Sequence, residues 1–342
     1  MRLGAVRLDR LLAAIRSPLG RIVAGAVGAL CVLLIVRGIG VPAIGRVLAG
    51  AAALFPLVLA LEGAQLACTT LALRSLYGPR VPSGQLVRAG LIGYAVMGLV
   101  PAGRAVAEVT RASLLTRWVG AARAAAAAAR IQVATLIANG IISIAAVVAV
   151  VVSASAPAWL PLAIAGNGAV TLALGASVLL AARRRPGAWL GRVVPKAQGF
   201  GADLDDVLQA EPALPAGAIG WELLGRFFQV AQNAVFLACV GGEPTLSRAL
   251  TSEGIHLVGA ALGELIPGQL GATEGNYTLA AGALALPVAS AVAIALLAHI
   301  SQLVWVLAGS LVSVTWPAPP LPEGTAGARR GASAEPSVPL EG

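Results

Sequence analysis

The sequence predicts an all-α polytopic membrane protein with about six transmembrane helices and two broken or re-entrant hairpins that are related as an inverted repeat. Three observations support this fold class. Of the 342 residues, 58% are apolar and only 11% are charged, whereas soluble domains contain roughly 25% charged residues. Several apolar runs reach the roughly 20 residues that a transmembrane helix needs. A pattern containing proline and glutamate also occurs twice along the chain.

The apolar runs predict the positions of the spans. Runs long enough to cross about 30 Å of hydrocarbon occur at residues 22–39, 47–73, 131–153, 158–182, 215–240 and 287–314. The first run could be a signal peptide with "VPA" at 41–43 as its cleavage site, but Arg37 separates the run from that site and favours an uncleaved anchor. The predicted organisation is a basic cytoplasmic N-terminus (1–21), a membrane domain (22–314) and a disordered tail rich in Pro, Gly, Ser and Ala (315–342).

Charge sets the expected topology. The formal net charge is +9, but the basic residues cluster in short stretches between apolar runs, which indicates positive-inside topology rather than a nucleic-acid partner. If regions 84–118 and 245–285 each enter and leave on one side, twenty of the 24 basic residues lie in the cytoplasm together with both termini. The three cysteines lie in predicted spans without metal-ligand spacing, and the two histidines lack a catalytic spacing. We therefore expect no metal, no cofactor and no enzyme activity.

The two motif regions resemble each other. "LIGYAVMGLVPAGRAVAE" (91–108) and "LVGAALGELIPGQLGATE" (257–274) align without gaps. Three predicted spans separate the copies, so the copies lie on opposite sides of the bilayer, and Pro/Gly-interrupted segments at matching positions of an inverted repeat indicate a transporter's binding site. The aligned identical residues are Leu91 and Leu257, Gly93 and Gly259, Ala95 and Ala261, Leu99 and Leu265, Pro101 and Pro267, and Glu108 and Glu274.

Each proline is expected to begin a second half-helix. Proline in the first turn of a helix loses no hydrogen bond, so Pro101 and Pro267 suit that position. The N-terminus of such a helix carries unpaired N–H groups and partial positive charge. Arg104 could supply a bidentate contact to a phosphate or a carboxylate there. An anionic head group is therefore a reasonable ligand.

The charges in the two motifs favour different surroundings. Arg104, Glu108 and Arg111 stand at i, i+4 and i+7, which predicts a salt-bridge ladder on one helix face. That face either lines a polar path or faces cytosolic water as part of an interfacial amphipathic helix. Glu274 has no basic neighbour in sequence, and an unpaired carboxylate at membrane depth is costly. Glu274 therefore takes a partner from elsewhere or is protonated.

A further charged pair lies inside span 215–240. Glu222 and Arg226 are four residues apart, and Gln229 and Gln232 continue around the same helix, so this span faces protein or water rather than lipid. The pair either neutralises itself and fixes helix packing or lines a cavity. Further polar residues within the apolar regions could line the same cavity or form interhelical hydrogen bonds, namely Glu62, Gln65, His256, His299 and Gln302.

The stretches "VPAGRAVAEVTRASLL" and "IPGQLGATEGNYTLAAGAL" resemble the paired Pro-Gly…Glu motifs of the lysylphosphatidylglycerol synthase transmembrane (flippase-like) family, the membrane half of the bacterial multiple peptide resistance factor, in its stand-alone form. The first motif maps onto Pro101, Glu108 and Arg111, with Ala107 in place of the usual glycine. The second maps onto Pro267 and the Gly-x-x-Glu element from Gly271 to Glu274. The family often has an asparagine at the place that Met97 and Gly98 occupy here. Where the family has a Glu-Arg pair, this chain has Ala129 and Arg130.

The resemblance implies a multi-pass protein of the bacterial cytoplasmic (inner) membrane that moves a polar lipid between leaflets. The aminoacyl-transfer domain of fused family members is not found, so no lipid synthesis is expected. Alternatives are a small-solute secondary transporter and a non-transporting subunit that supports a lipid-biosynthetic enzyme. No Walker sequence occurs, which leaves passive scrambling, ion coupling or a partner's energy. The candidate substrate-binding residues are Pro101, Arg104, Glu108, Arg111, Glu222, Arg226, Pro267, Gly271 and Glu274.

Overall fold

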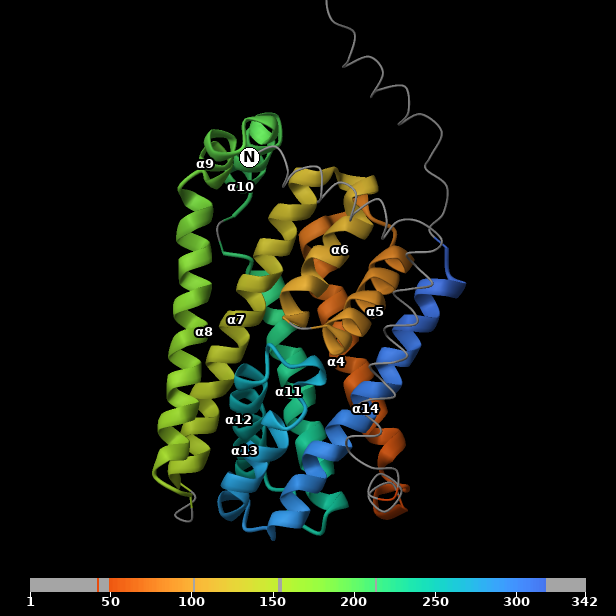
Figure 1. Cartoon of the computed structure of the whole chain (residues 1–342), viewed down its shortest axis with the longest axis vertical. Coiled ribbons are helices and arrows are strands. Elements are labelled where there is room, and N and C mark those ends of the chain that lie inside the picture. The colour runs from red at the N-terminus through yellow and green to blue at the C-terminus, as the bar shows by residue number, and fades with distance from the viewer. Residues whose placement is uncertain (1–41, 43–48, 101, 153–155, 213, 318–342) are drawn as a thin grey trace, which may run out of the picture.

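The fold is a bundle of helices (Figure 1). A computed structural model describes residues 42, 49–100, 102–152, 156–212 and 214–317, and the regular structure in these ranges is entirely helical. Four of the described helices are long and apolar enough to cross a membrane, judged by length and composition. The multi-pass membrane location expected from the sequence is thereby supported. These segments are Phe55–Arg80, Ala121–Val152, Trp159–Arg183 and Val288–Thr315.

The predicted spans correspond to individual helices where the chain is described. The helices are α4 (Phe55–Tyr77), α7 (Ala121–Val152), α8 (Trp159–Arg183), α11 (Ala216–Cys239) and α14 (Val288–Thr315). Although α11 is long enough to span, it carries charged and amide side chains and is not among the four helices that are apolar enough to cross a membrane. The predicted N-terminus 1–21, the span 22–39 and the tail beyond residue 317 lie outside the described residues.

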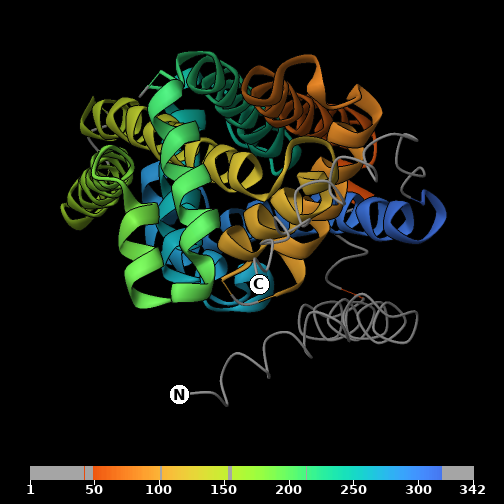
Figure 2. The ribbon, with the colours of Figure 1, turned by 90° about the horizontal axis from the view of Figure 1, so that it is seen from above.

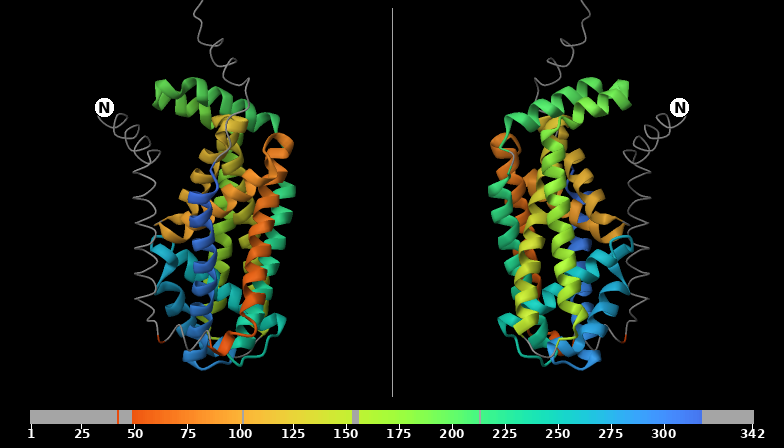
Figure 3. Two further views of the ribbon diagram at one scale, coloured as in Figure 1. Left: turned by 90° about the vertical axis from the view of Figure 1, so that its right-hand side faces the viewer. Right: turned by 90° about the vertical axis from the view of Figure 1, so that its left-hand side faces the viewer.

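Both motif regions fold as helical hairpins. The first consists of α5 (Ser83–Leu99) and α6 (Gly103–Val119). The second consists of α12 (Leu246–Leu262), the short η3 (Pro267–Gln269), α13 (Ala272–Ala280) and η4 (Ala281–Leu284). Figures 1 and 3 show the first hairpin in the upper half of the bundle and the second in the lower half.

The tips of the two hairpins meet inside the bundle. The backbone N–H of Ala102, at the first tip, donates a hydrogen bond of 2.9 Å to the carbonyl oxygen of Glu264, at the second. A small cavity of about 20 Å³ lies beside the tips. Its lining residues come from both tips and from α14. Each hairpin therefore ends at mid-height instead of running the full length of the bundle.

Matched glycines allow each hairpin to close. A Cβ atom added to Gly93 of α5 would lie 2.4 Å from Nε of Arg111 on α6. At the equivalent position of the second hairpin, a Cβ added to Gly259 of α12 would lie 3.1 Å from Cα of Thr273 on α13. At Gly93 the Arg111 side chain would have to move, and at Gly259 the backbone of α13 would have to shift by a few tenths of an ångström. The glycine shared by the two sequence motifs thus has the same packing role in both hairpins.

The second half-helix of the second hairpin begins later than the sequence predicted. Pro267 begins η3 instead of α13, which starts at Ala272. The reason is backbone conformation: φ is 64° at Gly268, 58° at Gln269 and 81° at Gly271, and such left-handed residues interrupt a right-handed helix. Pro101 lies outside the described residues, and α6 begins at Gly103.

A short helical pair lies across one end of the bundle. It contains α9 (Pro186–Val193), η2 (Pro195–Ala197) and α10 (Gln198–Ala210), and Figures 2 and 3 show it crossing the end of the long helices. The carboxylate of Asp205 accepts hydrogen bonds of 2.8 Å from the N–H groups of Gly187 and Ala188. These bonds satisfy free donors at the start of α9. The 3₁₀ turn η1 (Gly78–Arg80) follows α4 at the same end.

Two large apolar cores leave a polar layer between them, and a small third cluster joins α4, α5 and α14. The cluster at the first-hairpin end includes the C-terminal half of α4 and the start of α11, with Leu73 and Ala218 as members. The larger cluster at the second-hairpin end includes Val58 of α4 and Val230 of α11. Charged and amide residues occupy the intervening turns of both helices. The bundle therefore keeps its polar side chains at mid-height, near the hairpin tips.

Close packing of α14 on α5 gives a first stability prediction. A Cβ at Gly309 would lie 2.2 Å from the carbonyl oxygen of Leu91, a backbone atom that cannot rotate away. We expect Gly309→Ala to destabilise the protein by about 1–3 kcal/mol, the usual cost of overpacking, measured as reduced thermal stability in detergent. Gly166→Ala in α8 is the matched control because nothing lies within 4 Å of its added Cβ. Equal stability of the two variants would contradict the close approach of α14 and α5.

Candidate functional site

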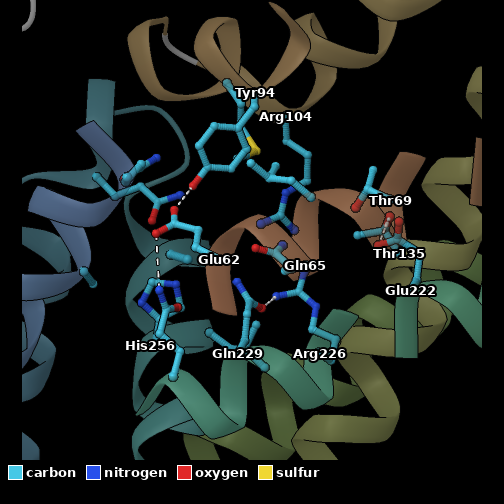
Figure 4. A pocket seen from close by; sticks show the side chains of 18 of the residues that line it. Glu62, Gln65, Thr69, Tyr94, Arg104, Thr135, Glu222, Arg226, Gln229 and His256 are labelled. Carbon is cyan, nitrogen blue, oxygen red and sulfur yellow. Dashed lines mark hydrogen bonds between the residues drawn. The ribbon is translucent and has the colours of Figure 1, made fainter. Parts of the chain in front are cut away.

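A polar cavity lies between the two apolar cores, beside the hairpin tips (Figure 4). It has about 130 Å³ of space that water-sized molecules can enter. A single water needs roughly 10–15 Å³ of such space, so the cavity accommodates several waters or a small polar group, but not a whole lipid. Its charged side chains are Glu62, Arg104, Glu108, Arg111, Glu222 and Arg226, which come from α4, α6 and α11.

Most residues singled out in the sequence lie at this cavity. Five of the candidate substrate-binding residues line it: Arg104, Glu108, Arg111, Glu222 and Arg226. All five of the additional polar candidates line it as well: Glu62, Gln65, His256, His299 and Gln302. Glu274 contacts the lining residue His299, while Gly271 immediately precedes α13. Pro267 lies in η3 at the second tip.

The first motif forms one ion pair instead of the predicted ladder. Arg111 donates to the carboxylate of Glu108, and only 6% of Arg111 is exposed. Arg104 forms no hydrogen bond or ion pair with any residue that the structure describes. Figure 4 shows the Arg104 side chain extending from α6 into the pocket. Arg104 is therefore a cation that faces the cavity without a counter-charge.

Arg226 does not pair with Glu222, so the self-neutralising pair is not formed, whereas the alternative that both residues line a cavity agrees with the structure. Nη1 of Arg226 lies 3.6 Å from Oε1 of Glu253 on α12 and also donates to Gln229. In Figure 4 the side chains of Arg226 and Glu222 point in different directions. Helical spacing allows an i, i+4 contact but does not enforce it. A buried carboxylate on the neighbouring helix offers Arg226 a partner in a more water-excluded setting.

Glu253 belongs to a fully buried polar network. Only 1% of Glu253 is exposed, and its Oε2 accepts a 2.9 Å hydrogen bond from Nδ2 of Asn233. The Oδ1 atom of Asn233 in turn accepts from Ser252 at 2.6 Å and from the Tyr277 hydroxyl at 3.3 Å. This network ties α11, α12 and α13 together. It fixes the position of Glu253, and through Glu253 that of the Arg226 guanidinium.

Glu62 accepts hydrogen bonds from neutral donors. The Tyr94 hydroxyl donates to its Oε1, and Nε2 of Gln232 donates to its Oε2 at 3.2 Å. The same Gln232 nitrogen also lies 3.2 Å from the carbonyl oxygen of Val58. These contacts join α4 to α5 and to α11. Both carboxylate oxygens of Glu62 are therefore occupied.

Glu274 takes a partner from another helix, one of the two outcomes expected for it. Its Oε1 lies 3.1 Å from Nε2 of His299 on α14. Its Oε2 accepts a 2.8 Å hydrogen bond from the N–H of Gly271, at the N-terminus of its own helix. Glu108 and Glu274, the matched glutamates of the two motifs, are thus both paired, although their partners differ in kind.

Sequence reasoning missed several residues that complete the site. Glu253 lies in the second motif region, but Arg248 and His256 are close to it in sequence, so the criterion that singled out Glu274 does not select it. Tyr94, Thr69 and Thr135 also line the cavity. Each is an uncharged polar residue in a largely apolar helix, and no spacing distinguishes such a residue from one that makes an interhelical hydrogen bond.

The apolar helices, the paired hairpins and the charged cavity at mid-height define a helical multi-pass membrane protein with a polar chamber inside the bundle. Residues 21–309 match the model of the family described as "Lysylphosphatidylglycerol synthase TM region", and the chain belongs to this family. The resemblance seen in the two motifs is thereby confirmed. Comparisons with curated proteins and with solved structures give no match.

Proposed function

We propose that this protein moves a lipid with an anionic head group between the leaflets of the bacterial cytoplasmic membrane. The observation that carries the proposal is the unpaired Arg104 in a chamber that also holds Arg226. A phosphate crossing the hydrocarbon unaided loses its hydration, and the cost is large. Two guanidinium groups in a water-accessible chamber replace part of that hydration with charge-assisted hydrogen bonds.

The two arginines suit this role in different ways. Arg226 is 7% exposed and held by Glu253 and Gln229, so its guanidinium is fixed in place. Arg104 lies in the first turn of α6, where the helix dipole adds partial positive charge. Its freedom from protein partners lets it turn towards an entering anion. In this proposal Arg111 acts through Glu108, whose position it holds, and does not contact the phosphate itself.

The shape of the chamber supports movement of a head group rather than of a whole lipid. About 130 Å³ suffices for a small polar group, so the acyl chains stay in the surrounding membrane. The two hairpins reach the chamber from opposite ends of the bundle (Figure 3). We interpret them as re-entrant halves of an inverted repeat, the arrangement in which a midplane site opens to either side in turn. The lipid is moved without chemical change.

Basic residues give the proposed orientation. The end of the bundle that carries α9 and η2 has exposed cations, including Arg183, Arg184, Arg185, Arg192 and Lys196. Under the positive-inside rule this end faces the cytoplasm. The first hairpin then enters from the cytoplasmic side, and the second enters from the opposite side.

Reconstitution into liposomes tests the proposal. A fluorescent anionic phospholipid is placed in both leaflets, and an impermeant reducing agent quenches the outer one. The wild-type protein should raise the quenched fraction beyond the outer half, and Arg104→Gln should slow this movement about tenfold or more, because it removes a charge-assisted contact. Arg192→Gln on exposed α9 is the control and should resemble the wild type.

The other candidate functions give different results in the same experiment. A small-solute transporter or a subunit of a biosynthetic enzyme would leave the quenched fraction at the outer half for every variant. Movement at one rate in the wild type and in Arg104→Gln would show that the chamber does not bind the head group. Either result would contradict the proposal.

A further inference from the structure

Glu222 is a buried acid that has no ion pair within 4 Å among the described residues, although the charges of Arg226 and Arg111 act on it from farther away. It is 6% exposed, lines the cavity and lies on α11 between the two apolar cores. Its Oε2 accepts a 3.2 Å hydrogen bond from the Thr135 hydroxyl on α7. Its Oε1 is buried and has no hydrogen-bond partner of good geometry among the described residues, although the Thr69 hydroxyl on α4 also interacts with the carboxylate. Figure 4 shows Glu222 beside Thr69 and Thr135 at one edge of the pocket.

The other acids of the membrane interior each have an ion pair or accept a hydrogen bond at both oxygens. Glu108 pairs with Arg111, Glu253 with Arg226, and Glu274 with His299. Glu62 has no cationic partner, but both of its oxygens accept hydrogen bonds. Among the interior carboxylates that the structure describes, Glu222 is therefore the one that has no ion pair and also has an oxygen without a hydrogen-bond partner.

The charged groups around Glu222 do not replace that missing partner. Arg226 on its own helix is directed towards Glu253, and Arg111 on α6 is directed towards Glu108, which is itself negative. Cys68 is the titratable neighbour on α4, and α7 presents the neutral Thr135. A buried carboxylate with neither an ion pair nor a full set of donors is costly. A small cation from the cavity would remove that cost.

We propose that Glu222 binds a monovalent cation, a proton or Na⁺, and that this cation is coupled to the anionic head group. A proton adds to the free Oε1 and leaves a neutral carboxyl group. A sodium ion instead takes Oε1 together with the hydroxyl oxygens of Thr69 and Thr135. Both ligands supply the same missing positive charge. The cation site rests on the geometry of Glu222 alone, whereas the coupling rests on the function proposed above.

Electrostatics gives the sign of the coupling. The negative charge of Glu222 lowers the positive potential that Arg226, one turn away, and Arg104 present to the chamber. Binding of a cation to Glu222 removes that opposing charge, so the head group binds more tightly. By linkage, a bound head group strengthens cation binding by the same factor. A gradient of the cation would therefore drive net movement of lipid in one direction.

Infrared difference spectroscopy tests the cation site without any transport measurement. Purified protein in lipid is titrated with acid at constant Na⁺, and separately with Na⁺ against K⁺ at constant pH. If the proton is the ligand, acid produces a carboxyl C=O band that is lost in Glu222→Gln. If Na⁺ is the ligand, Na⁺ shifts a carboxylate band that is lost in the same variant. Glu222→Asp should retain a displaced band.

The control for this measurement is Glu243→Gln. Glu243 is 72% exposed at its side chain and pairs with Arg248 at 3.0 Å, away from the cavity. Its spectrum should match that of the wild type in the bands assigned to Glu222. The retained band in Glu222→Asp also guards against a folding defect in Glu222→Gln. Bands that are unchanged in Glu222→Gln in both titrations would overturn the assignment.

Liposome measurements test the coupling. We expect a gradient of the relevant cation to change the rate of lipid movement by the wild type about tenfold, within the usual range of coupling between sites, and not to change the rate by Glu222→Gln. If the rate of lipid movement by the wild type does not change with either gradient, the coupling is overturned and the proposed function still stands. No lipid movement under any condition would overturn the proposed function, and the spectroscopic result would still decide whether Glu222 binds a cation.

Discussion

Replacing Arg226 with methionine is expected to destabilise the protein by about 3–5 kcal/mol, the usual cost of removing one member of a buried ion pair. Methionine keeps the length of the side chain and removes its charge. Glu253, which is 1% exposed, then remains in the bundle with Asn233 as its hydrogen-bond donor and without an ion pair. The measurement is reversible unfolding in mixed micelles, compared with the wild type.

The double variant separates the ion pair from the packing of the arginine stem. Arg226→Met combined with Glu253→Gln leaves neither member of the pair charged, and replacing both members of a buried pair is often neutral. We therefore expect the double variant to recover most of the lost stability. If it is no more stable than Arg226→Met alone, Glu253 is not the partner that Arg226 compensates. The double variant should still lose lipid movement, because a guanidinium of the proposed phosphate site is gone.

Much of the site could be predicted from the sequence because charged residues are rare in this chain. In a protein with 11% charged residues, an arginine or a glutamate inside an apolar segment is conspicuous, and the cost of burying it implies a polar cavity or a partner. This reasoning found Arg104, Glu222 and Arg226. The repeated proline and glutamate likewise marked both hairpins, since the chance of matching two uncommon residues at the same offsets is low.

The choice of ion-pair partners could not be predicted in the same way. Spacing along one helix indicates which side chains share a face, but it carries no information about neighbouring helices. Spacing alone therefore indicates Glu222 as the partner of Arg226, whereas α12 brings Glu253 within 3.6 Å of the Arg226 guanidinium. Glu274 meets His299 only because α13 packs against α14. These pairings are properties of the tertiary fold.

The length of the second tip also escaped prediction for a local reason. A proline is compatible with the first turn of any helix, so Pro267 gave no sign that the turn would be a short 3₁₀ helix. What delays α13 is the left-handed backbone from Gly268 to Gly271, which includes Gln269 as well as the two glycines. Two glycines near a proline indicate a turn, but they do not fix the residue at which the following helix begins.

A disulfide across the two hairpin tips is expected to abolish lipid movement. The 2.9 Å hydrogen bond from Ala102 N–H to the carbonyl oxygen of Glu264 brings the two backbones close, which is compatible with the roughly 4.4–6.8 Å that a disulfide requires between Cα atoms. Alanine already places a Cβ at position 102, so Ala102→Cys adds no backbone strain. If the head group passes from one side of the chamber to the other, the tips must separate, and a covalent link prevents this.

The experiment uses the pair Ala102→Cys and Glu264→Cys in a background where Cys31, Cys68 and Cys239 are replaced by serine or alanine. Oxidation should stop movement of the fluorescent phospholipid, and a reducing agent should restore it, while each single cysteine variant should be indifferent to both treatments. Full activity of the oxidised pair would show that the tips stay together while the lipid moves. The path of the head group would then have to run beside the tip contact instead of through it, and the alternating role proposed for the two hairpins would be wrong.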